Sequence, residues 1–332
     1  MYNPYADIDF SSTKYIASVS HAHCTKQSVL DTLHNNGIQH VAISNYYPSE
    51  PCYPLSEYFI PYDEMIQCPN AEHHNFYNPF GVTGRLHING LGSLFTSGSP
   101  SGETPLGMGG TDWKDGITQI LAGLQFQDAG GCTINHPAWT GINAKNCCDM
   151  LDYDPRVLGI EIYNQSCEEY NDIPNGWAVD TWDIILKTGR RCFGFAVPDH
   201  QHEINNIVRG KNILLCDGSE YGCLKAYRKG CFYAKVGIGD LKITSIVYRN
   251  GVFSAHFNNA ANVELVTDSF KKTFNNVTSI SENVNIDDYV FVRLKITDSN
   301  DTLFTNPIFL NKQGTPLESR KNNIGIRIAL FS

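Results

Sequence analysis

Long apolar runs are missing from this chain of 332 residues. No stretch approaches the roughly 18 consecutive apolar residues that a membrane-spanning helix needs. A secretory signal requires a basic segment followed by an apolar run, and residues 1–10 contain neither. We therefore expect a cytoplasmic protein that does not bind a membrane.

Concentrated positive charge is missing too. The chain has 25 Lys and Arg residues against 34 Asp and Glu residues, and its formal net charge is -9. A protein that binds nucleic acid needs a concentrated Lys and Arg surface to contact the phosphate backbone, and no such cluster occurs here. We expect no nucleic-acid partner.

A disulfide framework is not indicated either. The 11 cysteines are an odd number, no CxxC pair occurs, and Cys147 and Cys148 are adjacent, which is poor disulfide geometry. A reduced, intracellular chain explains these cysteines. Cys24 lies beside two histidines, where it is either a metal ligand or nucleophile or, as is common, a buried free thiol.

The order of apolar and polar segments predicts two domains, because 332 residues exceed the usual size of a single core. From residue 14 to residue 197, short apolar runs alternate with helical stretches, which is typical of βα units around a parallel sheet or barrel. The predicted strands cover residues 14–20, 40–44, 65–68, 86–91, 132–135, 157–163 and 191–197, and helices are predicted over 26–35, 113–126 and 179–187.

Beyond residue 237 the pattern changes to alternating strands separated by turns such as Asn250-Gly251. This spacing predicts a small β-sandwich. We therefore divide the chain into residues 1–237, an α/β domain, and residues 238–332, an all-β domain. Strands are expected over residues 242–249, 252–257, 263–267, 289–297 and 308–310.

Histidines and carboxylates follow the ends of the predicted strands. In a parallel barrel, the carboxyl ends of the strands form one face, where side chains from distant segments converge. Imidazole and carboxylate groups gathered there are metal-ligand chemistry, and such a set suits zinc, iron or manganese better than magnesium or calcium. The residues in these positions are His21, His23, Glu72, His136, His200 and His202.

The ordered motifs resemble those of the polymerase-and-histidinol-phosphatase (PHP) family of phosphoesterases. The resemblance covers roughly residues 15–237, and its motifs are the His-x-His segment, the Gly-x-Glu-like segment, the following His strand, the His-Pro motif and the closing Asp-x-His-like region. They lie at residues 20–25, 70–72, 86–92, 134–139 and 197–202.

This resemblance implies a distorted (β/α)7 barrel of the TIM-like kind, followed by a small immunoglobulin-like sandwich. It also implies metal-assisted hydrolysis of a small-molecule phosphoester, with one to three divalent transition-metal ions, zinc first and iron or manganese as alternatives. The implied metal ligands are His21, His23, Glu72, His87, His136, Asp199, His200 and His202.

Two departures from the family pattern affect the metal set. Ser44-Asn45-Tyr46 stands where the family usually has Thr-Asp-His, so one metal position is lost or weakened. In the closing motif, either His200 replaces the usual carboxylate or the turn shifts to present Asp199. One or two metals therefore fit the sequence better than three.

Three neighbouring residues have predicted roles. His87 is either a ligand or a proton carrier to the leaving group, and Arg85, two residues earlier in the same strand, is a candidate to bind an anionic substrate. Glu161 lies in a buried strand, where a bond to a ligand histidine would satisfy it. Alternative functions are hydrolysis of a carboxyl or carbamate ester, and metal or ligand binding with little catalysis.

Overall fold

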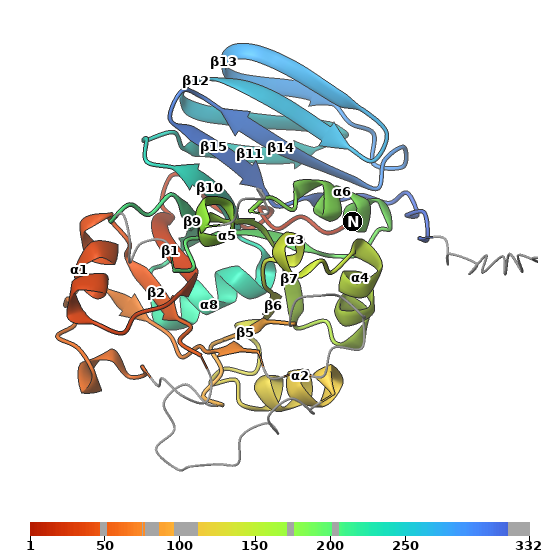
Figure 1. Ribbon diagram of the computed structural model, residues 1–332. Coiled ribbons are helices and arrows are strands. Elements are labelled where there is room, and N and C mark those ends of the chain that lie inside the picture. Colours follow the sequence, from red (N-terminus) through yellow and green to blue (C-terminus); the bar gives the residue numbers. More distant parts are fainter. Residues whose placement is uncertain are drawn as a thin grey trace, which may run out of the picture.

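The computed structural model describes residues 1–46, 52–74, 76, 86–95, 112–170, 176–200 and 206–317. Its strands form an eleven-stranded sheet, here called the large sheet, and a five-stranded sheet, here called the small sheet. In Figure 1 the C-terminal half of the large sheet lies across the top of the molecule, above the helices and the small sheet.

The small sheet has mixed pairing. Its order is β4-β5-β6-β7-β8, in which β6, β7 and β8 are parallel while β4–β5 and β5–β6 are antiparallel. Every residue of β5 to β8 is buried, which fits a sheet that is covered on both faces. The strands are β4 (Glu72–His73), β5 (Ile88–Leu91), β6 (Gly131–Ile134), β7 (Val157–Asn164) and β8 (Phe193–Val197).

The large sheet runs through both halves of the sequence. Its order is β11-β12-β14-β15-β10-β9-β1-β2-β3, with β13 paired to β12 and β16 paired to β14. The strands are β1 (Lys14–Ala22), β2 (His40–Ile43), β3 (Ile66–Gln67), β9 (Gly210–Cys216), β10 (Phe232–Gly237), β11 (Ile243–Arg249), β12 (Val252–Thr267), β13 (Lys271–Asn283), β14 (Phe291–Thr297), β15 (Asp301–Thr305) and β16 (Ile308–Phe309).

Helices pack on the sheets through one apolar face each. The buried residues Ile117 and Ile120 of α2 and Trp182 and Ile185 of α6 belong to the same apolar cluster as the small sheet. The helices are α1 (Gln27–Asn35), α2 (Trp113–Ala122), α3 (Pro137–Thr140), α4 (Ala144–Tyr153), α5 (Gln165–Tyr170), α6 (Val179–Lys187) and α8 (Glu220–Lys229), with a 3₁₀ turn at Leu55–Glu57. None of these helices has the length and apolar character that crossing a membrane requires.

The predicted (β/α)7, TIM-like barrel is wrong. In such a barrel all strands are parallel and belong to one closed sheet. Here β1 pairs antiparallel with β9, β5 pairs antiparallel with both of its neighbours, and the strands of the N-terminal half are divided between two sheets. Between these sheets, the β-bridges in the described residues are the isolated pairs Ala22–Asp199 and Tyr46–Glu72.

The predicted immunoglobulin-like sandwich is also wrong, although its strands exist. A sandwich needs two sheets that face each other, whereas β11 to β16 all belong to the large sheet and β15 joins them to β10. The 16-residue strand β12 pairs with β13 on one side and β14 on the other. The division of the chain into two domains at residue 237 stays a prediction.

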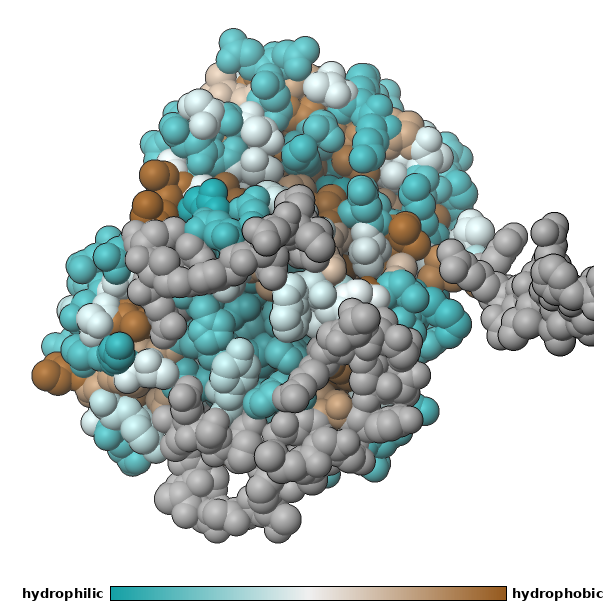
Figure 2. Space-filling model, in the orientation of Figure 1, coloured by the Kyte–Doolittle hydropathy of each residue, from teal (hydrophilic) through white to brown (hydrophobic). Residues whose placement is uncertain are grey.

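The surface of the C-terminal strands is mostly polar. On the face shown in Figure 2, hydrophilic residues predominate over this part of the large sheet, and hydrophobic residues are scattered among them. Ile238 and Val247 are examples of such exposed apolar side chains. Single exposed apolar residues are ordinary on a protein surface, so they do not indicate an interface.

Candidate metal centre

Seven of the predicted site residues lie in the described part of the chain, and six of them meet where the two sheets approach each other. His21 is the residue before the last of β1, and His23 follows that strand. Glu72 is the first residue of β4, and His87 directly precedes β5. His136 follows β6 directly, and Asp199 comes two residues after β8. The isolated bridges Ala22–Asp199 and Tyr46–Glu72 draw the two sheet edges together at this point.

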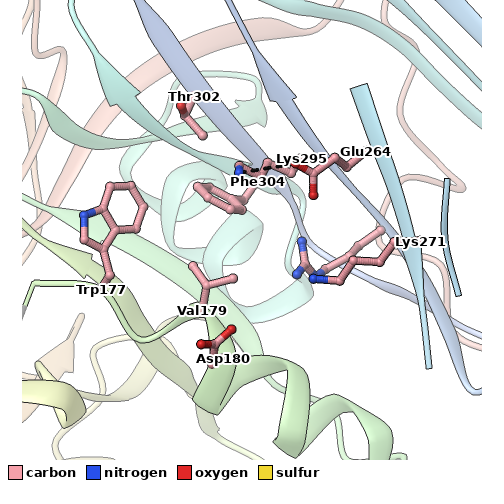
Figure 3. A pocket seen from close by; sticks show the side chains of 9 residues that line it. Trp177, Val179, Asp180, Glu264, Lys271, Lys295, Thr302 and Phe304 are labelled. Carbon is pink, nitrogen blue, oxygen red and sulfur yellow. Dashed lines mark hydrogen bonds and ion pairs between the residues drawn. The ribbon is translucent and has the colours of Figure 1, made fainter. Parts of the chain in front are cut away.

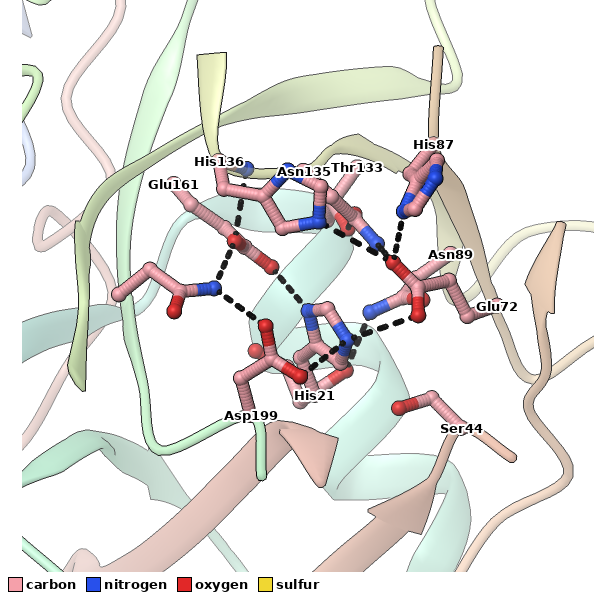
Figure 4. Close-up of polar contacts among 12 residues, drawn as sticks. His21, Ser44, Glu72, His87, Asn89, Thr133, Asn135, His136, Glu161 and Asp199 are labelled. Atoms are coloured by element: carbon pink, nitrogen blue, oxygen red, sulfur yellow. Dashed lines mark hydrogen bonds and ion pairs between the residues drawn. The ribbon is translucent and has the colours of Figure 1, made fainter. Parts of the chain in front are cut away.

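Four side-chain atoms form a compact first group. His21 Nε2 lies 3.3 Å from His23 Nε2, 3.4 Å from Glu72 Oε2 and 3.4 Å from Asp199 Oδ1. His23 Nε2 lies 3.1 Å from Glu72 Oε2 and 3.3 Å from Asp199 Oδ1. Figure 4 shows His21 between Glu72, Asp199 and Glu161. All four side chains of the group are buried.

The spacing of this group matches a tetrahedral metal site. Metal bonds of about 2.0–2.2 Å to nitrogen and oxygen give a tetrahedron with edges of about 3.3–3.6 Å. Five of the six edges are the distances above, and they run from 3.1 to 3.4 Å. The Asp199 Oδ1 atom is buried and accepts no hydrogen bond of acceptable geometry from the residues that the structure describes. The residues present therefore fit one divalent ion.

A second group surrounds the other oxygen of Glu72. Glu72 Oε1 lies 2.7 Å from His87 Nδ1 and 3.2 Å from His136 Nε2, and all three side chains are buried. The Glu72, His87 and His136 donors also lie close enough together to hold an ion. The 2.7 Å contact is shorter than the edge of a tetrahedral site, however, and is a normal hydrogen-bond distance.

Side chains around the first group hold its members in place. Glu161 Oε1 lies 2.7 Å from His21 Nδ1, so the predicted contact of Glu161 with a candidate ligand histidine is confirmed. Glu161 Oε2 accepts hydrogen bonds from the His136 backbone N–H at 2.8 Å and from Asn164 at 3.0 Å. Asn164 also donates to Asp199 Oδ2 at 3.0 Å. Such outer contacts fix the orientation of metal ligands.

Sequence reasoning missed the asparagines of the centre. Besides Asn164, Asn135 donates to Glu72 Oε1 at 3.1 Å and to Asn89 at 3.0 Å, and Asn89 donates to the Ser20 carbonyl. A usable signal was present, because Asn135 directly precedes the predicted ligand His136 after β6, and Asn164 ends the neighbouring strand β7. Asparagine there attracts less notice than histidine because it is also common in turns.

The backbone is unusual at two of the candidate ligands. His136 has φ 27° and Asp199 has φ 56°, in the left-handed region that residues other than glycine rarely adopt. Each such conformation costs on the order of 1–3 kcal/mol, and these conformations cluster at functional sites. The hydrogen bond from the His136 N–H to Glu161 is one of the contacts that hold this geometry.

The electrostatics of the centre favour ionised carboxylates. Burial alone would raise the pKa of Glu72, but the charges of His21 and His87 outweigh it and hold that pKa well below its usual range. Asp199 behaves likewise, since His21 and His23 lower its pKa against the effect of burial. Burial opposes a proton on His21, yet the charges of Asp199, Glu72 and Glu161 raise its pKa well above the ordinary value.

Three buried carboxylates, Glu72, Glu161 and Asp199, thus share a small volume. Among the described residues, no Lys or Arg forms an ion pair with any of them. Uncompensated buried charge is costly, so either protons on the histidines or a bound cation must balance it. A cation that replaced those protons would release them, which makes its affinity depend on pH.

The remaining predicted residues fall outside the two groups. His200 stacks on His23 with ring centroids 3.7 Å apart, and its Nε2 lies 3.1 Å from the Tyr46 hydroxyl and 3.7 Å from Asp199 Oδ1. Of the two alternatives, Asp199 therefore belongs to the compact group and His200 lies beside it. Arg85 and His202 lie outside the described residues.

Two other sequence features have structural explanations. Asn45 bonds the backbone of Cys24 from both sides, with its Oδ1 accepting from the N–H and its Nδ2 donating to the carbonyl, each at 2.7 Å. It therefore supports the loop that carries His23. The buried Cys24 thiol points to the Lys26 carbonyl at 3.6 Å and belongs to neither group.

Comparison of the chain with family models, with curated proteins and with solved structures gave no match. The resemblance to the PHP family stays a prediction from sequence motifs. What stands independently of it is that two groups of buried His, Glu and Asp side chains could hold a metal ion.

Proposed function

We propose that the protein is a metal-dependent hydrolase that acts on a small-molecule phosphoester. The observation that supports this most strongly is the set of five distances among His21, His23, Glu72 and Asp199, which are close to the edges of a metal tetrahedron. The ordered PHP-like motifs supply the reaction class, since the same residues occupy the positions of that family's metal ligands.

Zinc is the ion we propose for the first group. Two imidazole nitrogens and two carboxylate oxygens in a tetrahedron suit zinc, and iron or manganese are the alternatives. Glu72 offers its second oxygen to His87 and His136, and these three residues would hold a second ion, which would bring the total to two.

A divalent ion here would lower the pKa of a water molecule and polarise an ester oxygen. The chain's own residues contribute orientation and proton transfer. Glu161 fixes the ring of His21 through Nδ1, which leaves Nε2 directed at the first group. His87 is fixed through its Nδ1 by Glu72, and burial lowers its pKa. A neutral His87 could take up a proton or, once charged, deliver one to a leaving group.

The closed shape of the first group favours a second candidate function. Four protein ligands around one ion are typical of structural zinc, whereas catalytic zinc usually keeps a position open. A protein that binds metal mainly for stability, with little turnover, would have this geometry. Hydrolysis of a carboxyl or carbamate ester is a third candidate, because the same chemistry applies to a carbonyl carbon.

Elemental analysis and two ester substrates separate these candidates. The protein would be purified without added metal, analysed before and after reconstitution with zinc, iron or manganese, and assayed on p-nitrophenyl phosphate and p-nitrophenyl acetate. We expect bound metal and metal-dependent cleavage of the phosphate, both lost in Asp199→Asn and kept in Asp63→Asn, which changes an exposed aspartate elsewhere.

Each other outcome has a definite meaning. Bound metal without cleavage of either ester would favour the structural role, and cleavage of the acetate alone would favour the carboxyl-ester hydrolase. Failure to bind any of the three metals after reconstitution would refute the metal centre itself.

A further inference from the structure

A pocket of about 440 Å³ lies between the start of α6 and the C-terminal strands of the large sheet. This volume is within the range of about 300–1,000 Å³ that is typical of small-molecule sites. Its lining comes from Trp177, two residues before α6, from α6 itself and from β12 to β15 (Figure 3). None of these residues belongs to the two groups of candidate metal ligands.

The deepest polar group of the pocket is Arg293, which is 1% exposed. Its Nε and Nη2 atoms donate to Asp183 Oδ1 at 3.0 and 2.5 Å, and its guanidinium lies 4.8 Å from the Trp182 ring centroid. Its Nη1 atom is buried and has no hydrogen-bond partner among the described residues. Buried donors are nearly always satisfied, so this N–H group indicates an acceptor that enters the pocket.

The charges around the pocket cancel. Three cations, Lys271, Arg293 and Lys295, line it together with the carboxylates of Asp180 and Glu264. Lys295 lies 3.4 Å from Glu264, and the Asp183 carboxylate behind Arg293 makes the third negative charge. A ligand with a strong net charge would find no excess of opposite charge here.

Asp180 provides an acceptor opposite these donors. Its side chain is exposed and forms no hydrogen bond or ion pair in the described part of the chain. The pocket therefore offers a donor at Arg293 Nη1 and an acceptor at Asp180. Groups that both donate and accept, such as hydroxyls, match this combination.

Two aromatic rings form an apolar side of the pocket. Trp177 is 38% exposed, and its ring centroid lies 6.1 Å from that of Phe304 at an interplanar angle of 55°. In Figure 3 Val179 and Phe304 lie between Trp177 on one side and Lys271 on the other. The face of an aromatic ring attracts the C–H groups on one face of a saturated ring, while polar residues contact the polar groups at the edge of that ring.

We propose that this pocket binds a neutral polyhydroxylated ring, such as one sugar unit of a carbohydrate. Trp177 contacts the C–H face of the ring beside the buried Phe304, Arg293 Nη1 donates to one hydroxyl and Asp180 accepts from another. A carboxylate ligand is a poorer match, because the charges around the pocket cancel and the Nε and Nη2 atoms of Arg293 already donate to the Asp183 carboxylate.

Saturation-transfer NMR with defined probes tests this proposal. The probes are the methyl glycosides of glucose, galactose and mannose, N-acetylglucosamine and, as charged comparisons, acetate and methyl phosphate, whose methyl protons report binding, all at millimolar concentration. We expect at least one neutral sugar to bind, with an affinity about tenfold lower in Trp177→Ala and in Asp180→Ala. Ile184→Ala, an exposed site on the same helix outside the pocket, is the matched control and leaves binding unchanged.

Asp180→Ala keeps the test valid if Trp177→Ala impairs folding, since Trp177 also donates to Glu168. Binding of acetate or methyl phosphate in place of the sugars would overturn the neutral-ring proposal. Absence of any sugar signal, or equal sugar binding by wild type and both pocket variants, would overturn the site. The readout involves no hydrolysis, so it is independent of the proposed function.

Discussion

Replacing Glu161 by glutamine isolates the contribution of one carboxylate that touches no ion directly. Glu161 Oε1 accepts from His21 Nδ1, while its Oε2 accepts from the His136 N–H and from Asn164. Glutamine has the same shape but carries one acceptor oxygen and one donor N–H₂ group. In either orientation of the amide, its N–H₂ group faces an N–H donor, either that of His21 or those of the His136 backbone and Asn164.

Loss of this partner lowers metal affinity tenfold to a hundredfold, the usual effect of removing an outer carboxylate from a ligand histidine. The corresponding change in binding free energy is about 1.4–2.7 kcal/mol. His21 loses both the orientation of its ring and the negative charge that raises the basicity of its Nε2. The metal-free protein is destabilised as well, by about 1–3 kcal/mol, since a buried donor is left unsatisfied.

Competition for zinc against a chromophoric chelator measures the affinity directly. The matched control is Glu64→Gln, because Glu64 makes the same 2.7 Å contact with a histidine, His34, at the surface. We expect the control to bind zinc as the wild type does. Equal affinity in Glu161→Gln and wild type would refute the view that Glu161 orients a metal ligand.

Three further predictions concern stability. Burial lowers the pKa of His40 to about 3 from 6.5, so the folded state resists the proton that the unfolded state takes up; stability is lost as pH falls from about 6.5 towards 3. By pH 5 the loss of unfolding free energy amounts to about 2 kcal/mol. The urea midpoint should therefore fall less between pH 7.5 and pH 5 in His40→Asn, which can keep the Ser18 contact, than in the wild type. Arg293→Met leaves Asp183 buried without its partner and should cost about 3–5 kcal/mol in urea unfolding, whereas Arg293→Met combined with Asp183→Leu should recover most of it. Zinc added to the chelator-treated protein at about 100 times its dissociation constant should raise the unfolding free energy by about 2.7 kcal/mol, and an unchanged thermal midpoint would contradict binding to the folded state.

Local structure was predictable where short-range chemistry decides it. The strands expected at residues 14–20, 157–163 and 191–197 correspond to β1, β7 and β8. The Asn250-Gly251 turn is confirmed, since both residues have positive φ and connect β11 to β12. Asparagine and glycine adopt that conformation at little cost, which makes such a hairpin visible in the sequence.

Strand pairing was not predictable in the same way. An apolar run such as that of β5 shows that a strand is buried, but the direction of its neighbours depends on hydrogen bonds between distant segments. The antiparallel pairing of β5 with β6, and the connection of the C-terminal strands to β10 through β15, therefore escaped a reading based on periodicity and motif order.

The candidate ligands were largely predictable because their positions at strand ends do not depend on the direction of pairing. Six of them, including His87, lie in the two groups. The choice between Asp199 and His200 was not predictable, since it depends on the positive φ of Asp199 and on the stacking of His200 against His23. Both are products of the packed site.

The position of the candidate metal centre at the seam between the two sheets has a consequence for stability. His21 lies in β1 of the large sheet and His23 follows that strand, Glu72 opens the small sheet, and Asp199 comes from the loop beyond β8. An ion that binds all four would therefore cross-link segments far apart in the sequence. Cross-links that close long loops restrict the unfolded chain most. In the metal-loaded protein, amide hydrogens along this seam should therefore be the last whose exchange accelerates as denaturant is added. Once the ion is removed, they should be among the first.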